Sequence, residues 1–416
     1  MEETQKQEKP FPVSKQMVID AYQRVKTKGK AVGVDEQSMQ DFELKLDGNL
    51  YKIWNRLASG TYFPPAVREV EIPKKDGKMR KLGIPTVGDR IAQTVVKDYM
   101  ETSIDRLFHE NSYGYRALKS AHQALEVAKI RVRKFDWVID MDIKGFFDNI
   151  SHELILKALD KVVEEKWVKM YCKRWLEMPI QKADGTIVNK DGRGTPQGGV
   201  ISPLLANLFL HYAFDMWITK KHPTICFERY ADDIIVHCKT QIEAEELLLQ
   251  IAERIENCRL ELHPLKTKIV YCKDFRRKEK QQEVQFDFLG FSFQPRPTKD
   301  YQTGKIVNRF DLAISRASQK KITEEINSFQ IHRWSNGTIE EIAAILYSKL
   351  QGWINYYGKF RKWIFLNIFR RLSFRLMLWV KNKYKISSIK VSYQWLKKYQ
   401  KAHPSLFAHW TFGFKQ

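Results

Sequence analysis

Two acidic stretches of the chain carry carboxylates in a pattern that suits metal-dependent chemistry. In "FDWVIDMDI", Asp140 and Asp142 alternate with apolar residues, and in "FERYADDIIVHC", Asp232 and Asp233 stand between two apolar runs. Hard oxygen ligands suit Mg²⁺, and two such ions about 3.5–4 Å apart clamp the attacking and leaving oxygens of a phosphoryl transfer. Grouped carboxylates without cations raise one another's pKa. The pattern therefore indicates a two-metal site.

Each acidic stretch also has a simpler interpretation. Asp-Asp pairs commonly cap turns on a solvated surface, although a surface turn does not need the apolar runs that flank Asp232 and Asp233. Asp140 and Asp142 face the same side of a strand, because side chains two residues apart share a face. The residue pattern alone therefore does not choose between Asp140 and Asp142.

Strands, turns and helices must bring these carboxylates together. The pattern predicts strands at "FDWVIDMDI" and on both sides of Asp232, a hairpin around Asp76-Gly77, and a third strand pair at "KIVYC" with "VQFDFLGFSF". It predicts helices between Val13 and Gly60, with Asp35 as an N-cap, and at residues 89–107, 120–131 and 241–262. A Gly-rich loop opens a long apolar helix after residue 194, and from about Pro297 the pattern becomes helical, aromatic and basic.

Composition narrows the class of partner and the compartment. The 416 residues carry a formal charge of +22, and the last acidic residue is Glu341, which favours a polyanionic partner. The five cysteines form no Cys-x-x-Cys pair, so we expect reduced thiols in a cytoplasmic protein. The polar N-terminus does not match a signal peptide, and Arg370, Arg371 and Arg375 interrupt the longest late apolar stretch, so no membrane span is expected.

The order of these motifs resembles that of reverse transcriptases, and within them the group II intron-encoded reverse transcriptase/maturase family. "DIKGFFDNI" matches the segment that begins with the first metal aspartate, "GTPQGGVISPLLANLFL" the fingerprint loop, and Tyr230 to Asp233 the Tyr-x-Asp-Asp box. "HPLKTKIV" and "FDFLGFSF" match the two motifs that follow, "VREVEIPKKDGKMRKLGIPT" and "ENSYGYRALKSAHQAL" the fingers, and "LQGWINYYGKF" the thumb. The resemblance covers the chain from roughly Val18 to the end.

The resemblance implies an α+β right-hand polymerase with fingers, an antiparallel-sheet palm and a helical thumb, the maturase X domain. We expect an N-terminal extension and fingers at 1–84, the catalytic core at 85–296, the thumb at 297–380 and a basic nucleic-acid-binding extension at 381–416. Many family members also carry an HNH-type nuclease, but no matching His-Asn-His pattern or Cys pair follows the thumb motif.

The resemblance also assigns roles to single residues. Because the family motif has an aromatic residue five positions after its aspartate, as Phe147 follows Asp142, it selects Asp142 over Asp140. The catalytic and metal-binding residues implied are Asp142, Asp232 and Asp233, with Ile143 as a further metal contact. The nucleotide-binding residues implied are Lys74, Arg80, Phe147, Gln197 and Lys266. Phe147 would exclude a ribose 2′-hydroxyl by a steric clash, and Lys266 would protonate the leaving pyrophosphate.

Nucleic-acid contacts are implied for residues of the fingers and thumb: Arg116, Trp353, Tyr356, Tyr357, Lys359, Arg361 and Lys362. Aromatic faces with interleaved cations suit stacking on bases and neutralising phosphates. The alternatives are ordinary: a basic hairpin is often only solvated, Phe147 could pack in a core, Arg116 could hold the fingers, and the thumb aromatics could form a core helix with a cationic exposed side.

The implied function is RNA-directed DNA synthesis with two Mg²⁺ ions, for which Mn²⁺ could substitute, together with binding of the parent intron RNA to assist splicing and mobility. The implied partners are group II intron RNA, an RNA template with a DNA or RNA primer, target DNA and dNTPs, in the bacterial cytoplasm near the nucleoid. Two other hypotheses stay open. One is a retron-like or defence-associated reverse transcriptase, and the other is a non-enzymatic RNA-binding splicing factor with a vestigial palm.

Overall fold

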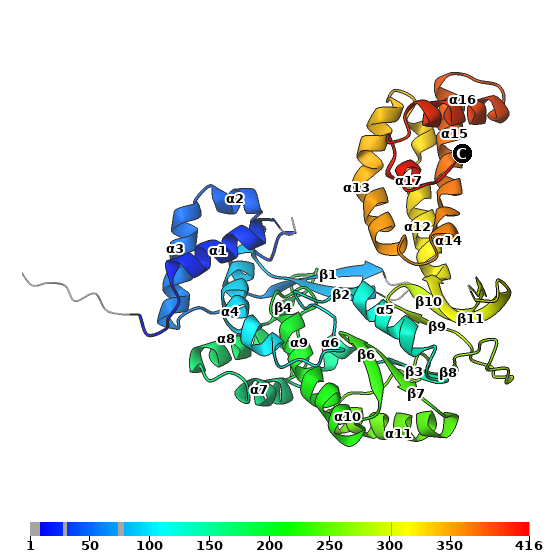
Figure 1. Cartoon of the computed structure of the whole chain (residues 1–416). Helices are drawn as coiled ribbons and strands as arrows, with labels where there is room; N and C mark the ends of the chain where they lie inside the picture. The colour runs from blue at the N-terminus through cyan, green and yellow to red at the C-terminus, as the bar shows by residue number, and fades with distance from the viewer. Residues whose placement is uncertain (1–8, 28–30, 74–78, 301, 416) are drawn as a thin grey trace, which may run out of the picture. The chain divides into compact units, whose positions relative to one another are not determined.

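The structure is a computed structural model that describes residues 9–27, 31–73, 79–300 and 302–415 (Figure 1). The chain divides into two compact units. The first comprises Met1–Ser120, Met141–Val236 and Glu245–Thr267, and the second comprises Ala121–Asp140, His237–Ala244 and Lys268–Gln416. Helices and largely antiparallel sheets occur together, which confirms the α+β class. The domain limits expected from the sequence stay predictions.

The first unit contains most of the helices that precede residue 260. Its helices are α1 (Lys15–Lys26), α2 (Met39–Glu43), α3 (Leu46–Ser59), α4 (Val87–Asp105), α6 (Phe146–Asn149), α7 (His152–Asp160), α8 (Lys166–Glu177), α9 (Ser202–Leu210), the π-helical turn η1 (His211–Asp215), α10 (Met216–Lys221) and most of α11 (Gln241–Asn257). Its strands are β1 (Val67–Pro73), β2 (Met79–Ile84), β4 (Ile180–Gln181), β5 (Ile187–Val188), β6 (Cys226–Tyr230) and most of β7 (Asp233–Cys238).

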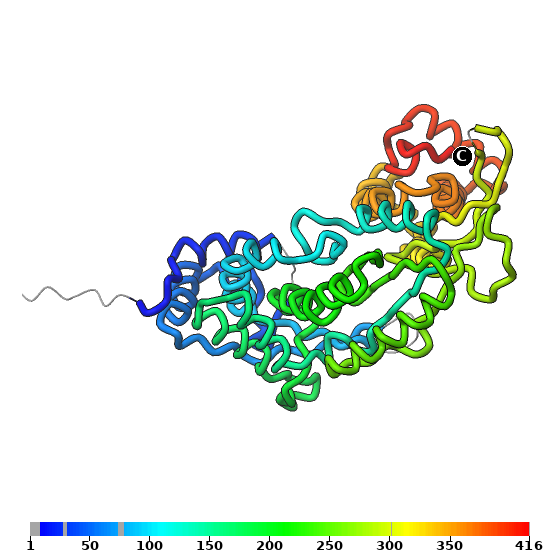
Figure 2. The backbone as a smooth tube through the Cα atoms, turned by 60° about the horizontal axis from the view of Figure 1, so that its bottom comes forward, coloured from blue at the N-terminus to red at the C-terminus, as the bar shows by residue number. Residues whose placement is uncertain are grey.

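The second unit contains α5 (Ala121–Arg131), β3 (Trp137–Asp142) except for its last two residues, β8 (Lys268–Tyr271), β9 (Phe286–Phe288), β10 (Phe291–Lys299), β11 (Ile306–Ile314), α12 (Arg316–Ser328), the 3₁₀ turn η2 (Ile331–Arg333), α13 (Ile339–Tyr357), α14 (Lys362–Leu366), α15 (Phe369–Lys383), α16 (Ile389–Ala402) and α17 (Ala408–Thr411). Figures 1 and 2 show α12, α13 and α15 running side by side. Their apolar faces share one core, which includes Leu346, Leu372 and Trp379.

The basic hairpin expected near residue 76 is present. Strands β1 and β2 pair antiparallel with Glu71 opposite Lys81, and they join a four-stranded sheet in the order β2-β1-β4-β5. The turn itself, including Lys74, lies outside the described residues. The N-cap expected at Asp35 is wrong. Helix α2 begins after Ser38, whose hydroxyl and amide bond reciprocally with Asp41, while the Asp35 carboxylate accepts from the amide of Gln37.

The pairing expected between the "KIVYC" and "VQFDFLGFSF" segments is also wrong. The "KIVYC" strand, β8, pairs with β3, placing Trp137 opposite Tyr271. The "FDFLGFSF" segment instead forms β9 and the start of β10 in a separate sheet, β11-β10-β9.

Residues after Pro297 are not yet helical, because β10 continues to Lys299 and pairs with β11. Beyond Phe293, β10 has no β9 partner, so its other edge tolerates Pro295 and Pro297, which lack an amide hydrogen.

The five cysteines are free thiols, as expected, and four of them are buried. None of the helices in the described ranges is long and apolar enough to cross a membrane.

Candidate active site

Asp142 lies at the end of β3, where the chain leaves the sheet. The amide of His263 donates to its carbonyl oxygen at 2.7 Å, and the next residue, Ile143, forms a β-bridge with Leu262. This backbone pairing fixes the direction of the Asp142 side chain, which is 33% exposed. Lys266 donates from Nζ to Asp142 Oδ2 at 2.9 Å, so the residue expected to protonate pyrophosphate lies beside the first aspartate.

Asp232 lies in the tight turn between β6 and β7, and Asp233 begins β7. Burial raises the pKa of the Asp232 carboxyl, and the nearby charge of Asp142 raises it further, whereas Arg80 and Lys266 act in the opposite direction. The structure therefore brings Asp142 and Asp232 close enough for their charges to interact. Ala231, which directly precedes Asp232, has a φ of 57°, in the left-handed region that an alanine seldom adopts.

A buried polar network holds this turn. Arg229, at 0% side-chain exposure, forms a two-pronged ion pair with the equally buried Asp215, at 2.7 and 2.6 Å. Its remaining nitrogen donates to Asn207 Oδ1 at 2.9 Å and to the carbonyl of Ala231 at 3.3 Å. The guanidinium thus connects the η1 and α9 helices to the residue that precedes Asp232, and it satisfies the carbonyl of the strained alanine.

Phe147 lies on the short helix α6, which begins four residues after the end of β3. The amide of Thr195 donates to the Phe147 carbonyl at 2.8 Å, so the glycine-rich loop is hydrogen-bonded to this helix. The Phe147 ring is 9% exposed and meets Phe146 edge-on at a centroid distance of 5.2 Å. Packing explains much of this position, and selection by Phe147 against a 2′-hydroxyl stays a prediction.

The structure brings together Arg80 and Gln197, whose binding of a nucleotide stays a prediction. Arg80 Nε donates to Gln197 Oε1 at 2.6 Å, and Gln197 Nε2 donates to Asp148 Oδ1 at 3.2 Å. The loop is also bound to β2 through its backbone, since the amide of Gly83 donates to the Gln197 carbonyl at 2.8 Å. Any side chain at Gly198 would come within 2.6 Å of the Gly83 carbonyl, so this contact requires glycine.

Arg116 serves the protein's own structure in the first unit. Its guanidinium pairs with Asp105 at 2.7 Å and donates to the carbonyls of His109 and Ser112. Only 8% of its side chain is exposed. This arrangement favours the interpretation in which Arg116 holds the fingers over the one in which it binds a template, which stays a prediction.

The thumb residues do not gather into a single open surface. Arg361 pairs with Asp311 at 2.9 Å and bonds Pro297 and Thr298. Tyr356 and Tyr357 pack against Phe291. For these three residues the structure supports the alternative of internal packing, and nucleic-acid binding stays a prediction.

The other thumb residues differ in their surroundings. Lys359 pairs with Glu126 at 2.7 Å, and Lys362 lies over the Phe412 ring at 4.1 Å. Trp353 packs partly against the thumb core. Trp363, three residues beyond the end of the thumb motif at Phe360, is 60% exposed.

The carboxylates fit a divalent cation on chemical grounds. Asp142 and Asp232 present hard oxygen donors, and the burial that raises the pKa of the Asp232 carboxyl, together with the nearby charge of Asp142, disfavours its charged form, a cost that a cation would relieve. The Lys266 ammonium on Asp142 supplies positive charge where such a cation would bind. Asp142, Asp232, Asp233 and the backbone of Ile143 are the groups that would hold it. Among the residues described, no three His, Cys, Asp or Glu side chains already gather in a metal-binding arrangement.

Comparison with known proteins decides the family. Residues 72–293 match the family model described as reverse transcriptase (RNA-dependent DNA polymerase). The chain belongs to the reverse transcriptase family. Residues 319–400 match the maturase-specific domain of group II introns, so this reverse transcriptase combines the two regions that the sequence motifs predicted, and its resemblance to the group II intron family is confirmed.

Curated relatives support this grouping. The chain is 29% identical over 280 residues to Protein YkfC of Escherichia coli, across 58% of this chain and 73% of that protein. It is 37% identical over 161 residues to the group II intron-encoded protein LtrA of Lactococcus lactis, across 38% of this chain but 26% of LtrA. The match therefore spans about a quarter of LtrA. Among solved structures, telomerase from Candida albicans aligns with a TM-score of 0.47 at 12% identity, over 84% of this chain and 65% of that one.

Sequence reasoning missed the residues that support the turn. Asp215 lies within an apolar helical run, and Arg229 lies within an apolar strand; a buried charge of each sign was the available signal. Tyr115 was also missed. Burial raises the pKa of its hydroxyl and the charge of Asp232 raises it further, which places the tyrosine near the aspartates.

Proposed function

We propose that this chain is an RNA-directed DNA polymerase, in which a primer 3′-hydroxyl attacks the α-phosphate of a dNTP and pyrophosphate leaves. The observation that carries the proposal is the electrostatic proximity of Asp142 and Asp232, two carboxylates from separate strands, within a chain of the reverse transcriptase family. Two bound Mg²⁺ ions, or Mn²⁺ in their place, would lower the pKa of the attacking hydroxyl and stabilise charge on the transferred phosphate.

The chain's own residues position the substrates. The planar guanidinium of Arg80 would bind the triphosphate, and the amide oxygen of Gln197 holds this guanidinium by accepting a hydrogen bond from it. Lys266 carries a proton within reach of the metal-binding aspartate and would deliver it to the leaving pyrophosphate. Phe147 forms the floor beneath the incoming sugar, where a 2′-hydroxyl would clash.

We also infer that the chain binds its parent group II intron RNA and assists its splicing and mobility. The maturase-domain match and the absence of acidic residues after Glu341 support this role. The template, primer and target DNA would use the same excess of positive charge, in the bacterial cytoplasm beside the nucleoid. The thumb at 297–380 and the extension at 381–416 are the regions proposed for intron contact.

The test separates the two activities. Wild type, Asp232→Ala and the exposed-site control Asp160→Ala are compared in primer extension on poly(rA)/oligo(dT) and in binding of intron RNA. We expect Asp232→Ala to abolish cDNA synthesis and to bind intron RNA as wild type does, while Asp160→Ala changes neither. Normal synthesis by Asp232→Ala would overturn the polymerase assignment, and loss of RNA binding would overturn the separation of the two roles.

A further inference from the structure

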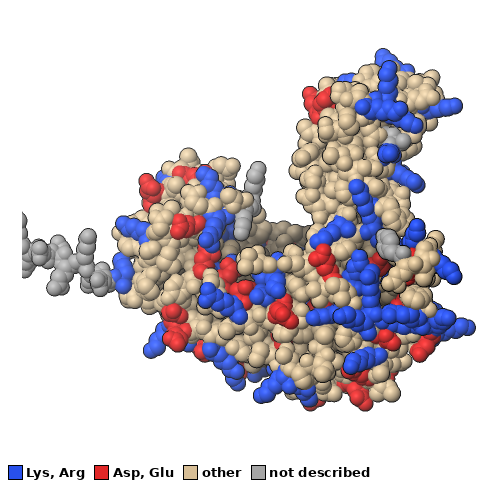
Figure 3. Space-filling model, viewed as in Figure 1, with Lys and Arg blue, Asp and Glu red and all other residues tan. Residues whose placement is uncertain are grey.

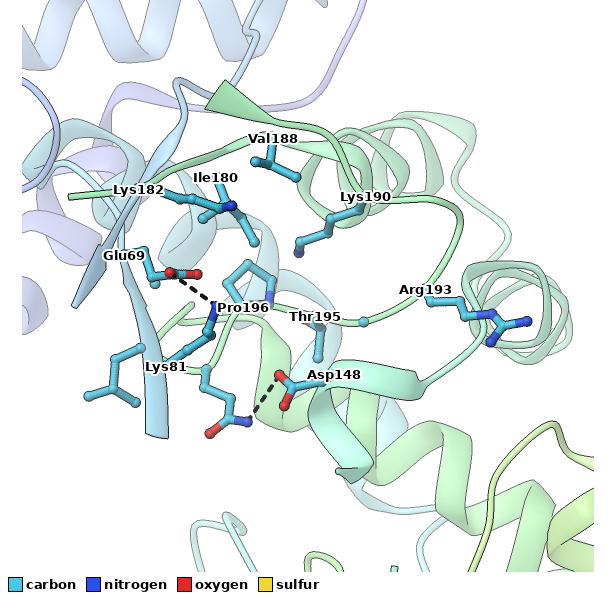
Figure 4. Close-up of a pocket in the computed structure, with 14 residues that line it drawn as sticks. Glu69, Lys81, Asp148, Ile180, Lys182, Val188, Lys190, Arg193, Thr195 and Pro196 are labelled. Atoms are coloured by element: carbon cyan, nitrogen blue, oxygen red, sulfur yellow. Dashed lines mark hydrogen bonds and ion pairs between the residues drawn. The ribbon is translucent and has the colours of Figure 1, made fainter. Parts of the chain in front are cut away.

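A cavity of about 380 Å³ lies in the first unit beside the glycine-rich loop (Figure 4). Its walls come from β1, β2, the β4–β5 hairpin and residues 193–197. Of the residues assigned above to catalysis or nucleotide binding that the structure describes, Gln197 alone lines it. Asp142 and Asp232 do not line the cavity, and Gln197 is the point at which it adjoins the proposed dNTP site.

Three lysines line the cavity. Figure 4 shows Lys81, Lys182 and Lys190 reaching toward its interior from three different segments, whereas Arg193 points away from it. Two carboxylates also line the cavity, and both already have partners. Glu69 pairs with Lys81 at 3.4 Å, and Asp148 accepts a hydrogen bond from Gln197 at 3.2 Å.

Lys190 is the lining residue whose surroundings indicate a bound ligand. Its ammonium nitrogen is buried, and within the described part of the chain it has no hydrogen-bond partner. Burial lowers the pKa of this amine to about 8, so most of it still carries a proton at neutral pH. The charge of Asp148 acts in the opposite direction to burial, but it gives the ammonium no hydrogen bond. A buried charged group without a hydrogen-bond acceptor is costly, and a phosphate oxygen would provide the missing acceptor.

Part of the wall is apolar and suits the remainder of a nucleotide. Ile180, Val188 and Pro196 line the cavity beside the lysines. Its volume falls within the range of roughly 300–1,000 Å³ typical of small-ligand sites, which is more than a bare phosphate needs. Apolar surface would receive a sugar or base, while the ammonium groups would receive the phosphate.

We propose that this cavity binds one nucleotide unit, with its phosphate on Lys190 and Lys182 and its sugar or base against Ile180, Val188 and Pro196. The unit is either a free nucleotide or one residue of an RNA strand, since both present the same phosphate and sugar. The site is additional to the dNTP site at the aspartates.

Binding is measured on the full chain in EDTA without primer, so that metal-dependent binding at the aspartates does not contribute. Isothermal titration calorimetry with 5′-AMP and with the pentanucleotide (rA)₅ gives affinity, and acetylation of lysines followed by peptide mass spectrometry gives location. The variants are Lys190→Met, which keeps the length of the side chain without its charge, and the matched control Lys220→Met on the exposed end of α10.

We expect Lys190→Met to weaken binding by about 10- to 100-fold, the value of one hydrogen bond to a charged group, and Lys220→Met to bind as wild type. The ligand should protect Lys190 and Lys182 from acetylation. Much tighter binding of (rA)₅ than of 5′-AMP identifies an RNA strand as the source, and equal affinities identify a free nucleotide. The proposal is overturned if wild type binds neither probe, or if Lys190→Met, with an unchanged melting temperature, binds as tightly as wild type.

Discussion

The ion pair of Asp215 and Arg229 shows, at the scale of single residues, how a strained turn is fixed. Both side chains are fully buried, so removing one leaves an uncompensated charge in the interior. We expect Arg229→Met to lower the free energy of unfolding by roughly 3–5 kcal/mol, measured by urea denaturation. The double variant Arg229→Met/Asp215→Leu should lose less than Arg229→Met alone, because it carries no orphaned charge. A double variant less stable than the single variant would contradict this account.

The buried carboxylate of Asp232, a proposed metal ligand, should lower the free energy of unfolding at neutral pH. Its pKa is raised on folding, so the folded state binds a proton more tightly than the unfolded state does. The free energy of unfolding therefore falls as the pH rises from the unfolded pKa, about 3.9, through the raised folded value. We expect Asp232→Asn to raise the melting temperature at pH 7 and to have little effect at pH 4.

The effect of Mg²⁺ on the melting temperature tests whether Asp232 binds metal. A ligand that binds only the folded state raises the melting temperature, so Mg²⁺ should stabilise wild type more than Asp232→Asn. Differential scanning fluorimetry from pH 4 to 8, with and without Mg²⁺, measures both effects, and the exposed-site variant Asp160→Asn is the control. A lower melting temperature for Asp232→Asn than for wild type at pH 7 would count against burial as the cause of the raised pKa.

At the scale of elements, the site depends on a close approach between the segment around Gly114 and the turn between β6 and β7. A Cβ at Gly114 would lie 2.5 Å from the amide nitrogen of Ala231, and the Gly114 carbonyl accepts from Asn207 Nδ2 at 2.7 Å. Gly114→Ala must therefore displace the backbone that carries Asp232. We expect a fall in the primer-extension rate of about 100-fold, comparable to a displacement of about 1 Å in an active site.

Gly48→Ala is the matched control for Gly114→Ala. Gly48 lies in α3 with nothing within 4 Å of an added Cβ, so the substitution should leave activity unchanged and stabilise the helix by up to about 1 kcal/mol. Equal activity of the two variants would show that the approach of Gly114 to the turn does not position Asp232.

Local patterns predicted single elements better than their partners. Alternating residues placed β3 correctly, and two apolar runs placed β6 and β7 on either side of the turn that holds Asp232. The pairing of Asp232 with Asp142 was implied by metal chemistry and the family resemblance, not by the strand pattern. The partner of β8 was predicted wrongly, because a short apolar strand has the same pattern whichever neighbour it pairs with. The partners of Arg116 and Arg361 could not be predicted either, since a cation's role depends on which carboxylate the fold brings to it.

At the scale of the whole molecule, the formal charge of +22 is spread unevenly along the sequence, because no acidic residue follows Glu341. Lys and Arg side chains gather over α5 and the neighbouring strands of the second unit, and others project from α15 and α16 (Figure 3). Positive charge of this kind attracts any polyanion, so it contributes affinity for RNA without contributing sequence specificity. Specific recognition of the intron must therefore add contacts that survive when salt screens these charges.

Helix α16 offers a place to measure that electrostatic share. Lys390 and Lys397 are seven residues apart and face the same side of the helix, Lys398 lies next to them, and all three are exposed. If each neutralises one phosphate, Lys390→Gln/Lys397→Gln/Lys398→Gln should make the slope of log affinity against log salt less steep by roughly 2–3, measured by filter binding of intron RNA. Lys173→Gln, whose lysine pairs with Glu177 in the first unit, should leave the slope unchanged. Because the effect is electrostatic, the triple variant should lose as much slope with an unrelated RNA as with the intron, and an unaltered slope with both would exclude this face of α16 from the interface.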